Sequence, residues 1–232
     1  MDNYIGISKE EALAETQRFI VKVYSWMSFA LLITGGVAMW TAMHVDIVRM
    51  IVQNQILFFG LIIGEFLMVG YLVGWIQKMS AQTATLVFVL YSVLNGLTFS
   101  VIFLLYTAAS IASTFFITAG TFAVMSAYGY FTKSDLTRWG NLLFMGLIGV
   151  IIASVVNMFF HSPALYWFTT YAGILIFVGL TAYDTQKIKK MNVIGNEGTE
   201  EDKKEAIVGA LVLYLDFINL FLLLLRLFGR RR

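Results

Sequence analysis

Two aspartates lie inside apolar stretches of this 232-residue chain, where a carboxylate is energetically costly. Asp184 follows an apolar run in the segment GLTAYDTQKIKK and precedes three lysines. Asp216 lies well inside LVLYLDFINLFLLLL, with no basic residue within two helical turns on either side. Ionisable groups in segments of hydrocarbon length usually mark an ion or proton pathway. We therefore take Asp184 and Asp216 as the leading candidates for a functional site.

Paired carboxyl groups have a definite chemistry. Two carboxylates within hydrogen-bond reach in a low-dielectric site cannot both ionise cheaply, so they share a proton. Such a pair can switch near neutral pH between a closed, singly protonated form and an open form with separated charges. Carboxylate oxygens also suit Ca²⁺, which takes six to eight oxygen ligands. Asp184 and Asp216 alone supply too few ligands for tight binding, so they predict a weak, transient calcium site.

A third acid, Glu65, stands in the middle of another apolar run, LIIGEFLMVGY. An ionised carboxylate at that depth costs about 2.5–3.5 kcal/mol on insertion scales, so Glu65 should face protein, be protonated or have a partner. Gly60 and Gly64 have the spacing that lets another helix approach closely, and Gly70 and Gly74 repeat it. Glu65 is thus predicted to be a third calcium ligand or a proton site.

Two asparagines complete the predicted ion or proton site. Asn95 lies in the third apolar run and Asn219 lies three residues after Asp216. An interhelical hydrogen bond is the simpler role for Asn95, as it is for Asn157 in the fifth run. A polar or small stripe at heptad spacing suits a helix in the middle of a bundle. The last run has such a stripe, which consists of Gly209, Val212, Asp216, Asn219, Leu223 and Arg226. The sixth run has a matching face, which consists of Gly173, Phe177, Leu180 and Asp184.

The depths of the two aspartates test whether they can meet. Asp184 lies at, or about one turn inside, the cytosolic end of the sixth run. Asp216 lies about nine residues, or ~13 Å, inside the seventh run. The two carboxyl groups therefore meet only if the sixth helix sits deep, the seventh starts below the surface, or the helices tilt.

The elements that carry these residues are membrane spans. The chain is 59% hydrophobic and 13% charged, whereas soluble domains are about 45–50% apolar and about 25% charged. Seven apolar runs are each near the roughly 20 residues that cross a bilayer. We predict an all-α integral membrane protein, a seven-helix bundle with its last helix central. The spans cover about 21–43, 56–76, 84–106, 111–131, 142–160, 165–184 and 207–228.

Charge at the ends of these runs predicts the orientation and the partners. With the N-terminus inside, cytosolic segments hold eleven of the sixteen Lys and Arg residues, as the positive-inside rule requires. Residues 1–20 are then a cytosolic tail or surface helix, 21–229 a single membrane domain and 230–232 a basic tail. Seven spans place that basic tail outside, so the last run either is held across by packing or does not fully cross. The longest cytosolic loop is Thr185–Glu205, charged and expected to be mobile.

Composition also excludes several classes of partner. The formal charge of +2 and the scattered basic residues exclude a nucleic-acid partner. The chain has no cysteine and only two histidines, which disfavours a zinc site and excludes a thiol nucleophile. We expect no cofactor. The expected partners are the lipid bilayer, protons, calcium as the permeant ion, and a membrane protease or another membrane protein.

Longer phrases around the aspartates resemble a known family. GLTAYDTQKIKKM and GALVLYLDFINLFLLLLRLFG are similar to the transmembrane Bax inhibitor motif family, in its bacterial branch, and LLYTAASIASTFFITAG and GNLLFMGLIGVIIASVVN fit it too. The resemblance implies a seven-helix bundle with a central last helix. The compact tail and short loops of the chain favour a bacterial inner membrane. The resemblance also implies a pH-sensitive calcium leak in which Asp184 and Asp216 form the hydrogen-bonded pH sensor and gate. Family members also carry a basic latch on the second helix. This chain has no Lys or Arg between Arg49 and Lys78, and has Glu65 instead.

Three other functions compete with the channel. An intramembrane aspartyl protease would have Gly-x-Gly before its second aspartate, but Asp216 follows VLYL. The Pro-Ala-Leu turn of those proteases occurs here before the sixth run, at Pro163–Leu165, so we predict that the protein is not an enzyme. A regulatory protein that modulates membrane proteolysis or stress and cell-death responses would act through the tail and the Thr185–Glu205 loop. A proton-coupled carrier would use Glu65 and Asp216 and show saturable, gradient-driven uptake.

Overall fold

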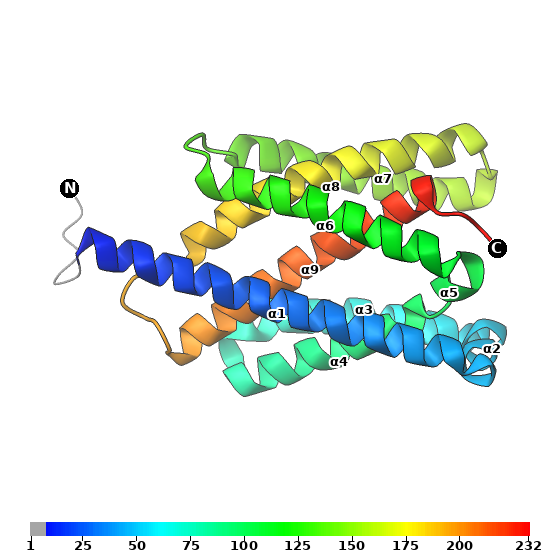
Figure 1. Cartoon of the computed structure of the whole chain (residues 1–232), viewed down its shortest axis with the longest axis horizontal. Helices are drawn as coiled ribbons and strands as arrows, with labels where there is room; N and C mark the ends of the chain where they lie inside the picture. Colours follow the sequence, from blue (N-terminus) through cyan, green and yellow to red (C-terminus); the bar gives the residue numbers. More distant parts are fainter. Residues whose placement is uncertain (1–7) are drawn as a thin grey trace. The chain divides into compact units, whose positions relative to one another are not determined.

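The computed structural model describes residues 8–232, and these residues are helical almost throughout. Figure 1 shows the chain as a set of long helices joined by short connections. In chain order the elements are α1 (Lys9–Met43), α2 (Val45–Gln53), α3 (Gln55–Trp75), the 3₁₀ turn η1 (Ile76–Lys78), α4 (Ala81–Phe99), α5 (Ile102–Leu105), α6 (Ala108–Phe131), α7 (Thr137–Phe160), α8 (Pro163–Met191) and α9 (Glu200–Phe228).

Seven of the described helical stretches are long and apolar enough to cross a membrane. They are α1, α3 with η1, α4 with α5, α6, α7, α8 and α9. In the most apolar part of α9, 67% of the residues are buried, against none in the corresponding part of α7. The all-α, seven-span prediction is confirmed, and α9 is the most buried span.

The helices group into two compact units. Of the described residues, the first unit contains 8–105 and 188–214, and the second contains 106–187 and 215–232. Helices α8 and α9 each contribute to both units, because the boundaries after residues 187 and 214 fall inside them. The remaining boundary, after residue 105, lies between α5 and α6. The single membrane domain predicted from the sequence stays a prediction.

In the first unit, α1 and α4 run parallel and in close contact (Figure 1). The Thr34 hydroxyl donates to the backbone oxygen of Ser92 at 2.9 Å. One turn further along both helices, a Cβ on Gly96 would lie only 2.6 Å from Val37 Cβ. Both contacts advance in the same direction along the chain, which makes the two helices parallel. A glycine is needed at position 96 because any side chain there would displace α1.

Tyr214 of α9 is the largest fully buried side chain of the described residues and belongs to this first unit. Its hydroxyl lies 2.8 Å from Thr34 Oγ1. Since the single hydroxyl hydrogen of Thr34 is donated to Ser92, Tyr214 must be the donor in this contact. The Tyr214 ring meets Phe88 and Tyr91 edge-on, at centroid distances of 6.0 and 5.8 Å.

Replacing Tyr214 with Phe is expected to lower the free energy of unfolding by about 1 kcal/mol, because one buried hydrogen bond is lost while the ring packing stays. Tyr171→Phe is the matched control, since the side chain of Tyr171 is exposed. Thermal unfolding in detergent, followed by circular dichroism, compares the two variants. Equal midpoints for both would contradict a stabilising Tyr214–Thr34 bond.

In the second unit, α7 and α8 pack antiparallel through small residues. A Cβ on Gly140 would overlap the ring of Tyr183, and a Cβ on Gly146 would lie 3.2 Å from Ile176. From the first contact to the second, the residue number increases in α7 and decreases in α8. The two helices therefore run in opposite directions. Small residues at such positions let two membrane helices approach closely.

The C-terminal tail pairs with the chain just before α6, also within the second unit. The Thr107 backbone N–H donates to the Arg230 carbonyl at 3.0 Å, and Tyr106 forms an isolated antiparallel bridge with Arg231. Figure 1 shows the C-terminus (red) near the start of α6. The end of α9 therefore lies at the same end of this unit as the start of α6. This agrees with a last helix that crosses fully and not with one that stops part-way.

The predicted loop Thr185–Glu205 is mostly helix. Helix α8 continues to Met191 and α9 begins at Glu200, so only residues 192–199 lie outside helices. Two lysines lie in the last turn of α8, and three acids lie in the first turn of α9. Each set has the sign that the helix dipole favours, so charge here extends the helices instead of ending them.

The predicted N-terminal tail is also helical from residue 9. Ser8 caps α1, with its hydroxyl accepting from the Glu11 backbone N–H at 3.2 Å and the Glu11 carboxylate accepting from the Ser8 backbone N–H at 2.8 Å. This capping box starts a helix that continues without a break into the first span. The remainder of the predicted tail, residues 1–7, lies outside the described residues.

The glycine spacing in α3 does not mark a helix contact in the described part of the chain. A Cβ built on Gly60, Gly64, Gly70 or Gly74 would meet no atom within 4 Å. Helix α4 does approach α3 beside Glu65, where Thr98 bonds to it, but the prediction that these glycines make the contact is wrong. Small residues permit close approach but do not cause it, because the neighbour must present a matching surface.

Candidate functional site

Helix α8 presents the predicted face to α9 within the second unit. A Cβ on Gly173 would lie 2.9 Å from Leu223, which places the two helices in direct contact at that level. One turn nearer Asp184, buried apolar side chains from both helices form a common core: Ile176, Phe177, Leu180, Leu220 and Leu224. The alignment of Gly173, Phe177, Leu180 and Asp184 on one face is confirmed. This apolar core forms one boundary of the site that follows.

The structure brings Asp184 and Asp216 together. Their carboxyl groups are hydrogen-bonded to each other. Both are buried, with exposed fractions of 9% for Asp184 and 5% for Asp216. A hydrogen bond between two carboxyl groups requires a proton on one of them, since ionised carboxylates only accept. The arrangement is that of two acids sharing one proton.

One oxygen of the pair has unused accepting capacity. Asp216 Oδ2 is fully buried, and among residues 8–232 no conventional donor bonds to it. Leaving a buried polar atom without a donor costs roughly 1–3 kcal/mol, and more for a charged group. The pair is therefore poorly satisfied as an ionised site.

The extension of α8 removes the depth mismatch expected between the aspartates. Helix α8 runs seven residues beyond Asp184, from Thr185 to Met191, which adds about 10 Å of helix at 1.5 Å per residue. Asp184 is consequently well inside its helix, and it is not a carboxylate at a helix end. The sequence left three ways for the aspartates to meet: a deep sixth helix, a seventh helix that starts below the surface, or tilted helices. The structure agrees with the first, because the sixth helix extends past Asp184.

A positive charge lies near the pair. Lys187 Nζ lies 6.0 Å from the centroid of the Tyr183 ring, and its charge acts on Asp184. Tyr183 in turn packs against Gly140 of α7. Lys187 thus provides a favourable field for the ionised form of Asp184 while its ammonium group rests against an aromatic face.

Two residues that position Asp184 are missed by sequence reasoning. Gln186 Oε1 accepts from the Leu136 backbone N–H at 2.9 Å, and its Nε2 donates to the Ser134 carbonyl at 2.8 Å. Gly129 of α6 lies so close to α8 that a Cβ there would overlap the carbonyl oxygen of Ala182. Gln186 is hidden among charged neighbours, and Gly129 is one of 19 glycines, so neither gives a distinctive signal.

Among the other predicted site residues, Glu65 bonds to a neighbouring helix, and the two asparagines bond within their own helices. Glu65 Oε1 accepts from the Thr98 hydroxyl at 2.6 Å, within the first unit. Asn95 and Asn219 each donate to the backbone carbonyl four residues earlier in their own helix, at 3.1 and 2.8 Å. For Asn95 this corrects the expected interhelical bond. A side-chain amide inside lipid can satisfy its donor most simply on its own helix.

Asn157 is also local, because its Oδ1 accepts from the Ser162 backbone N–H at 2.8 Å where α7 ends. That bond caps the helix instead of joining α7 to another span. Its predicted interhelical role is likewise corrected.

Residues 8–232 contain no group of three or more His, Cys, Asp or Glu side chains arranged to hold a metal ion. The paired carboxyl groups supply two oxygen-bearing side chains and no third. Any calcium at this site would complete its shell with water or backbone oxygens.

Comparison with known proteins places the sequence in a family. The family model described as "Inhibitor of apoptosis-promoting Bax1" matches residues 16–232, which includes both aspartate-bearing helices. The chain belongs to this Bax inhibitor-like family. As a member of the Bax inhibitor-like family, it is a multi-pass membrane protein whose paired aspartates lie within the matched region.

Individual members of the Bax inhibitor-like family are similar over nearly the full length. The inner membrane protein YbhL of Escherichia coli K12 is 52% identical over 220 residues, which covers 94% of each chain. A protein of Borreliella burgdorferi is 48% identical over 224 residues, covering 97% of this chain and 96% of its own. A protein of Deinococcus radiodurans is 36% identical over 227 residues, covering 98% and 96%.

Proposed function

We propose that the protein is a pH-sensitive calcium leak channel whose gate is the proton-sharing pair Asp184–Asp216. One observation carries the proposal. Two acids that are both more than nine-tenths buried are hydrogen-bonded inside membrane-spanning helices. Such a contact stabilises the helices only while a proton is shared.

Loss of the shared proton opens the pair. With both carboxylates ionised, like charges face each other in a site of low dielectric constant, and the α8–α9 contact becomes unfavourable. Separated carboxylates then offer oxygen ligands to a hard cation. Calcium flux therefore rises as the pH rises through the range in which the pair loses its proton.

The proposed setting is a bacterial inner membrane with the N-terminus in the cytosol. The relative YbhL is named an inner membrane protein. The distribution of Lys and Arg between the two ends of the spans supports the N-terminus inside. In this orientation the α8–α9 connection faces the cytosol, and the C-terminus lies outside.

The test is calcium flux from purified protein in vesicles. Wild type and Asp184→Asn are reconstituted in calcium-loaded vesicles, and release is followed against pH with a fluorescent indicator. Wild-type flux should rise with pH, and the variant should lack that rise. Asp46→Asn is the matched control, because the Asp46 side chain is fully exposed on α2.

Flux absent at every pH, or unchanged by Asp184→Asn, would contradict the channel. A regulatory protein would be favoured instead by a different pair of results. Substitutions in α1 or in the α8–α9 loop would leave the flux unchanged, and they would abolish a cellular stress phenotype. Saturable uptake driven by a proton gradient would favour a carrier.

A further inference from the structure

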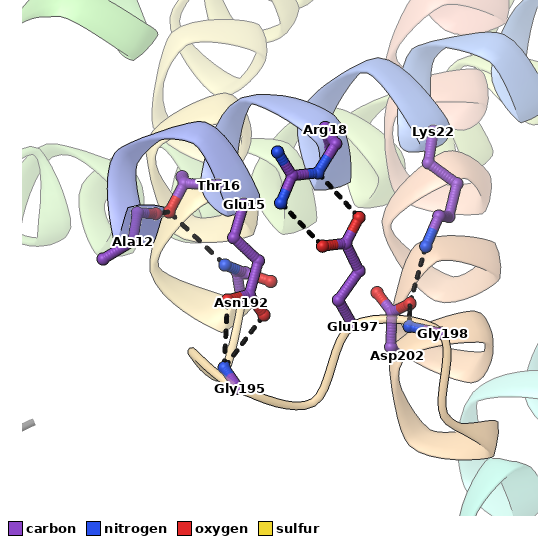
Figure 2. Close-up of polar contacts among 10 residues, drawn as sticks. All are labelled: Ala12, Glu15, Thr16, Arg18, Lys22, Asn192, Gly195, Glu197, Gly198 and Asp202. Atoms are coloured by element: carbon purple, nitrogen blue, oxygen red, sulfur yellow. Dashed lines mark hydrogen bonds and ion pairs between the residues drawn. The ribbon is translucent and has the colours of Figure 1, made fainter. Parts of the chain in front are cut away.

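Three charged side chains on one face of α1 contact the connection between α8 and α9 (Figure 2). Glu15, Arg18 and Lys22 occupy positions three and four residues apart, so they point to the same side of the helix. Every residue they contact belongs to the same compact unit as α1. We call this set of contacts the α1 clamp.

The first contact of the α1 clamp is buried. Both carboxylate oxygens of Glu15 accept from the Gly195 backbone N–H, at 2.9 and 3.0 Å. Glu15 is only 6% exposed. Gly195 has a φ of 92°, a left-handed conformation that glycine adopts without strain. The carboxylate therefore fixes a turn that the backbone can form only at a glycine.

The second contact is a two-pronged ion pair at the surface. Arg18 Nε donates to Glu197 Oε1 and its NH2 group donates to Glu197 Oε2, both at 2.7 Å. Figure 2 shows the two groups facing each other as parallel forks. Paired geometry of this kind is the strongest form of an arginine–carboxylate contact. Both side chains remain accessible to water and salt.

The third contact reaches the first turn of α9. Lys22 Nζ lies 2.6 Å from Asp202 Oδ2, and the Asp202 side chain is almost completely buried. The same oxygen accepts from the Gly198 backbone N–H at 2.7 Å. Gly198 has a φ of 83°, so this second turn also depends on glycine. Asp202 thus joins α1, the loop and the start of α9.

The connection held by the α1 clamp joins the two helices that carry the aspartates. Residues 192–199 follow α8, which contains Asp184, and lead directly into α9, which contains Asp216. We propose that the α1 clamp restrains the separation of α8 and α9, and so sets how readily the aspartate pair opens. This step rests on the proposed channel function, whereas the contacts themselves do not.

The charged chemistry of the α1 clamp makes it releasable. An apolar contact would be insensitive to ions, whereas an exposed arginine–glutamate pair weakens as salt concentration rises. A cytosolic partner or an anionic surface that competes for Arg18 or Glu197 would free the loop. The device therefore couples the cytosolic face to a gate inside the membrane.

The α1 clamp is not the pH sensor near neutrality. The hydrogen bond from Arg18 holds the pKa of Glu197 below its ordinary value of 4.5, and Lys22 also lowers it. A depressed carboxylate pKa contributes stability above the unfolded pKa, and that stability is lost as the pH falls through the folded pKa. Glu15 also faces Arg18 and favours its charged form. The Arg18–Glu197 bond should therefore keep constant strength from pH 8 to pH 6, because that whole range lies above both the folded and the unfolded pKa of Glu197.

Hydrogen exchange measures this directly. The protection factor of the 192–199 peptide, corrected for intrinsic exchange, should stay the same between about pH 6 and pH 8. Glu205 of α9 also faces this connection: burial raises its pKa above the ordinary 4.5, and its side chain is hydrogen-bonded to Asn196. A steady loss of protection over that range that persists in Glu205→Gln would contradict a pKa of Glu197 below its ordinary value.

A charge reversal and its rescue test the α1 clamp. Arg18→Glu and Glu197→Arg are each expected to speed amide exchange in residues 192–199 by about fivefold or more, because an attraction becomes a repulsion. The double variant Arg18→Glu/Glu197→Arg restores the pair and should return exchange to the wild-type rate. Arg49→Glu is the matched control, since it makes the same charge change at an exposed residue with only a 3.9 Å contact.

Flux separates a regulatory clamp from a structural one. In calcium-loaded vesicles the single reversals should raise flux at a given pH, and the double variant should return it to the wild-type level. The chain has no native cysteine, so Arg18→Cys/Glu197→Cys can be joined by a short bismaleimide. Cross-linking should lower flux below that of the same protein before the reagent is added.

Each outcome decides a different step. Unchanged exchange in both single variants overturns the α1 clamp. Faster exchange with unchanged flux, in the presence of wild-type flux, overturns its regulatory role. Wild-type protein without flux at any pH overturns the proposed function and the regulation built on it, while the exchange result still establishes or removes the clamp.

Discussion

Asp216→Asn is expected to hold calcium flux at its low-pH level across the whole pH range. The side-chain amide of asparagine can donate a hydrogen bond to Asp184 at every pH, as the protonated carboxyl group does only while the proton is shared. It also cannot ionise, so the repulsion that opens the pair never develops. The variant is thus a permanent mimic of the closed, singly protonated state.

The size of this effect follows from the repulsion that is removed. Two like charges about 4 Å apart interact by about 4 kcal/mol at an effective dielectric constant of about 20. About a third of that energy, ~1.4 kcal/mol, shifts an open–closed equilibrium tenfold. Flux at high pH should therefore fall by about tenfold or more. Vesicle release at matched protein density measures it.

The two single asparagine variants should behave alike, because either amide can donate to the remaining carboxylate. The exposed control Asp46→Asn should leave the pH profile unchanged. A variant with Asp216→Asn that keeps the wild-type rise of flux with pH would remove the pair from the gating mechanism.

Gly129→Ala is expected to cause the largest loss of stability among the glycine substitutions. A Cβ at this position would overlap the Ala182 backbone oxygen, and a backbone atom cannot move aside like a flexible side chain. Helices α6 and α8 would have to separate beside the aspartate pair. Overpacking of this kind typically costs about 1–3 kcal/mol. Thermal unfolding of the purified protein in detergent measures the loss.

Gly120→Ala is the matched control for this experiment. It lies on the same helix, and a Cβ there meets nothing within 4 Å. Alanine is favoured over glycine in a helix by roughly 0.5–1 kcal/mol, so this variant should be as stable as wild type or more stable. If both variants lose stability equally, the close approach of α6 to α8 is not the cause.

Hydrophobicity is what made the architecture predictable. Runs of about 20 apolar residues leave a membrane helix as the one favourable structure, and all seven predicted runs are helices. The facing surfaces of α8 and α9 were also predictable, because polar and small residues at regular spacing are rare in such runs. Predicting the contact of Asp184 with Asp216 requires knowing how far α8 extends beyond Asp184. Hydropathy underestimates that length, because the end of α8 is polar.

Charge and glycine were the sources of error. The polar sequence after Asp184 predicts a loop, whereas seven of its residues continue α8. Hydropathy locates where lipid ends and not where a helix ends. The glycines of α3 have a regular spacing and no neighbour, whereas Gly129 has no regular pattern and is in the tightest contact. Helix contacts depend on the opposite surface, which one chain segment does not encode.

The pairing of the C-terminal tail with Tyr106 and Thr107 has a practical consequence for mapping topology. A reporter enzyme fused after Arg232 reports on which side of the membrane the tail lies. Because the tail is paired with the α4–α6 connection, the reporter gives the side of that connection as well. An epitope inserted at that connection must therefore give the same answer as the fusion. Between these two points the chain contains four spans, α6 to α9, and an even number of crossings returns it to the side where it began.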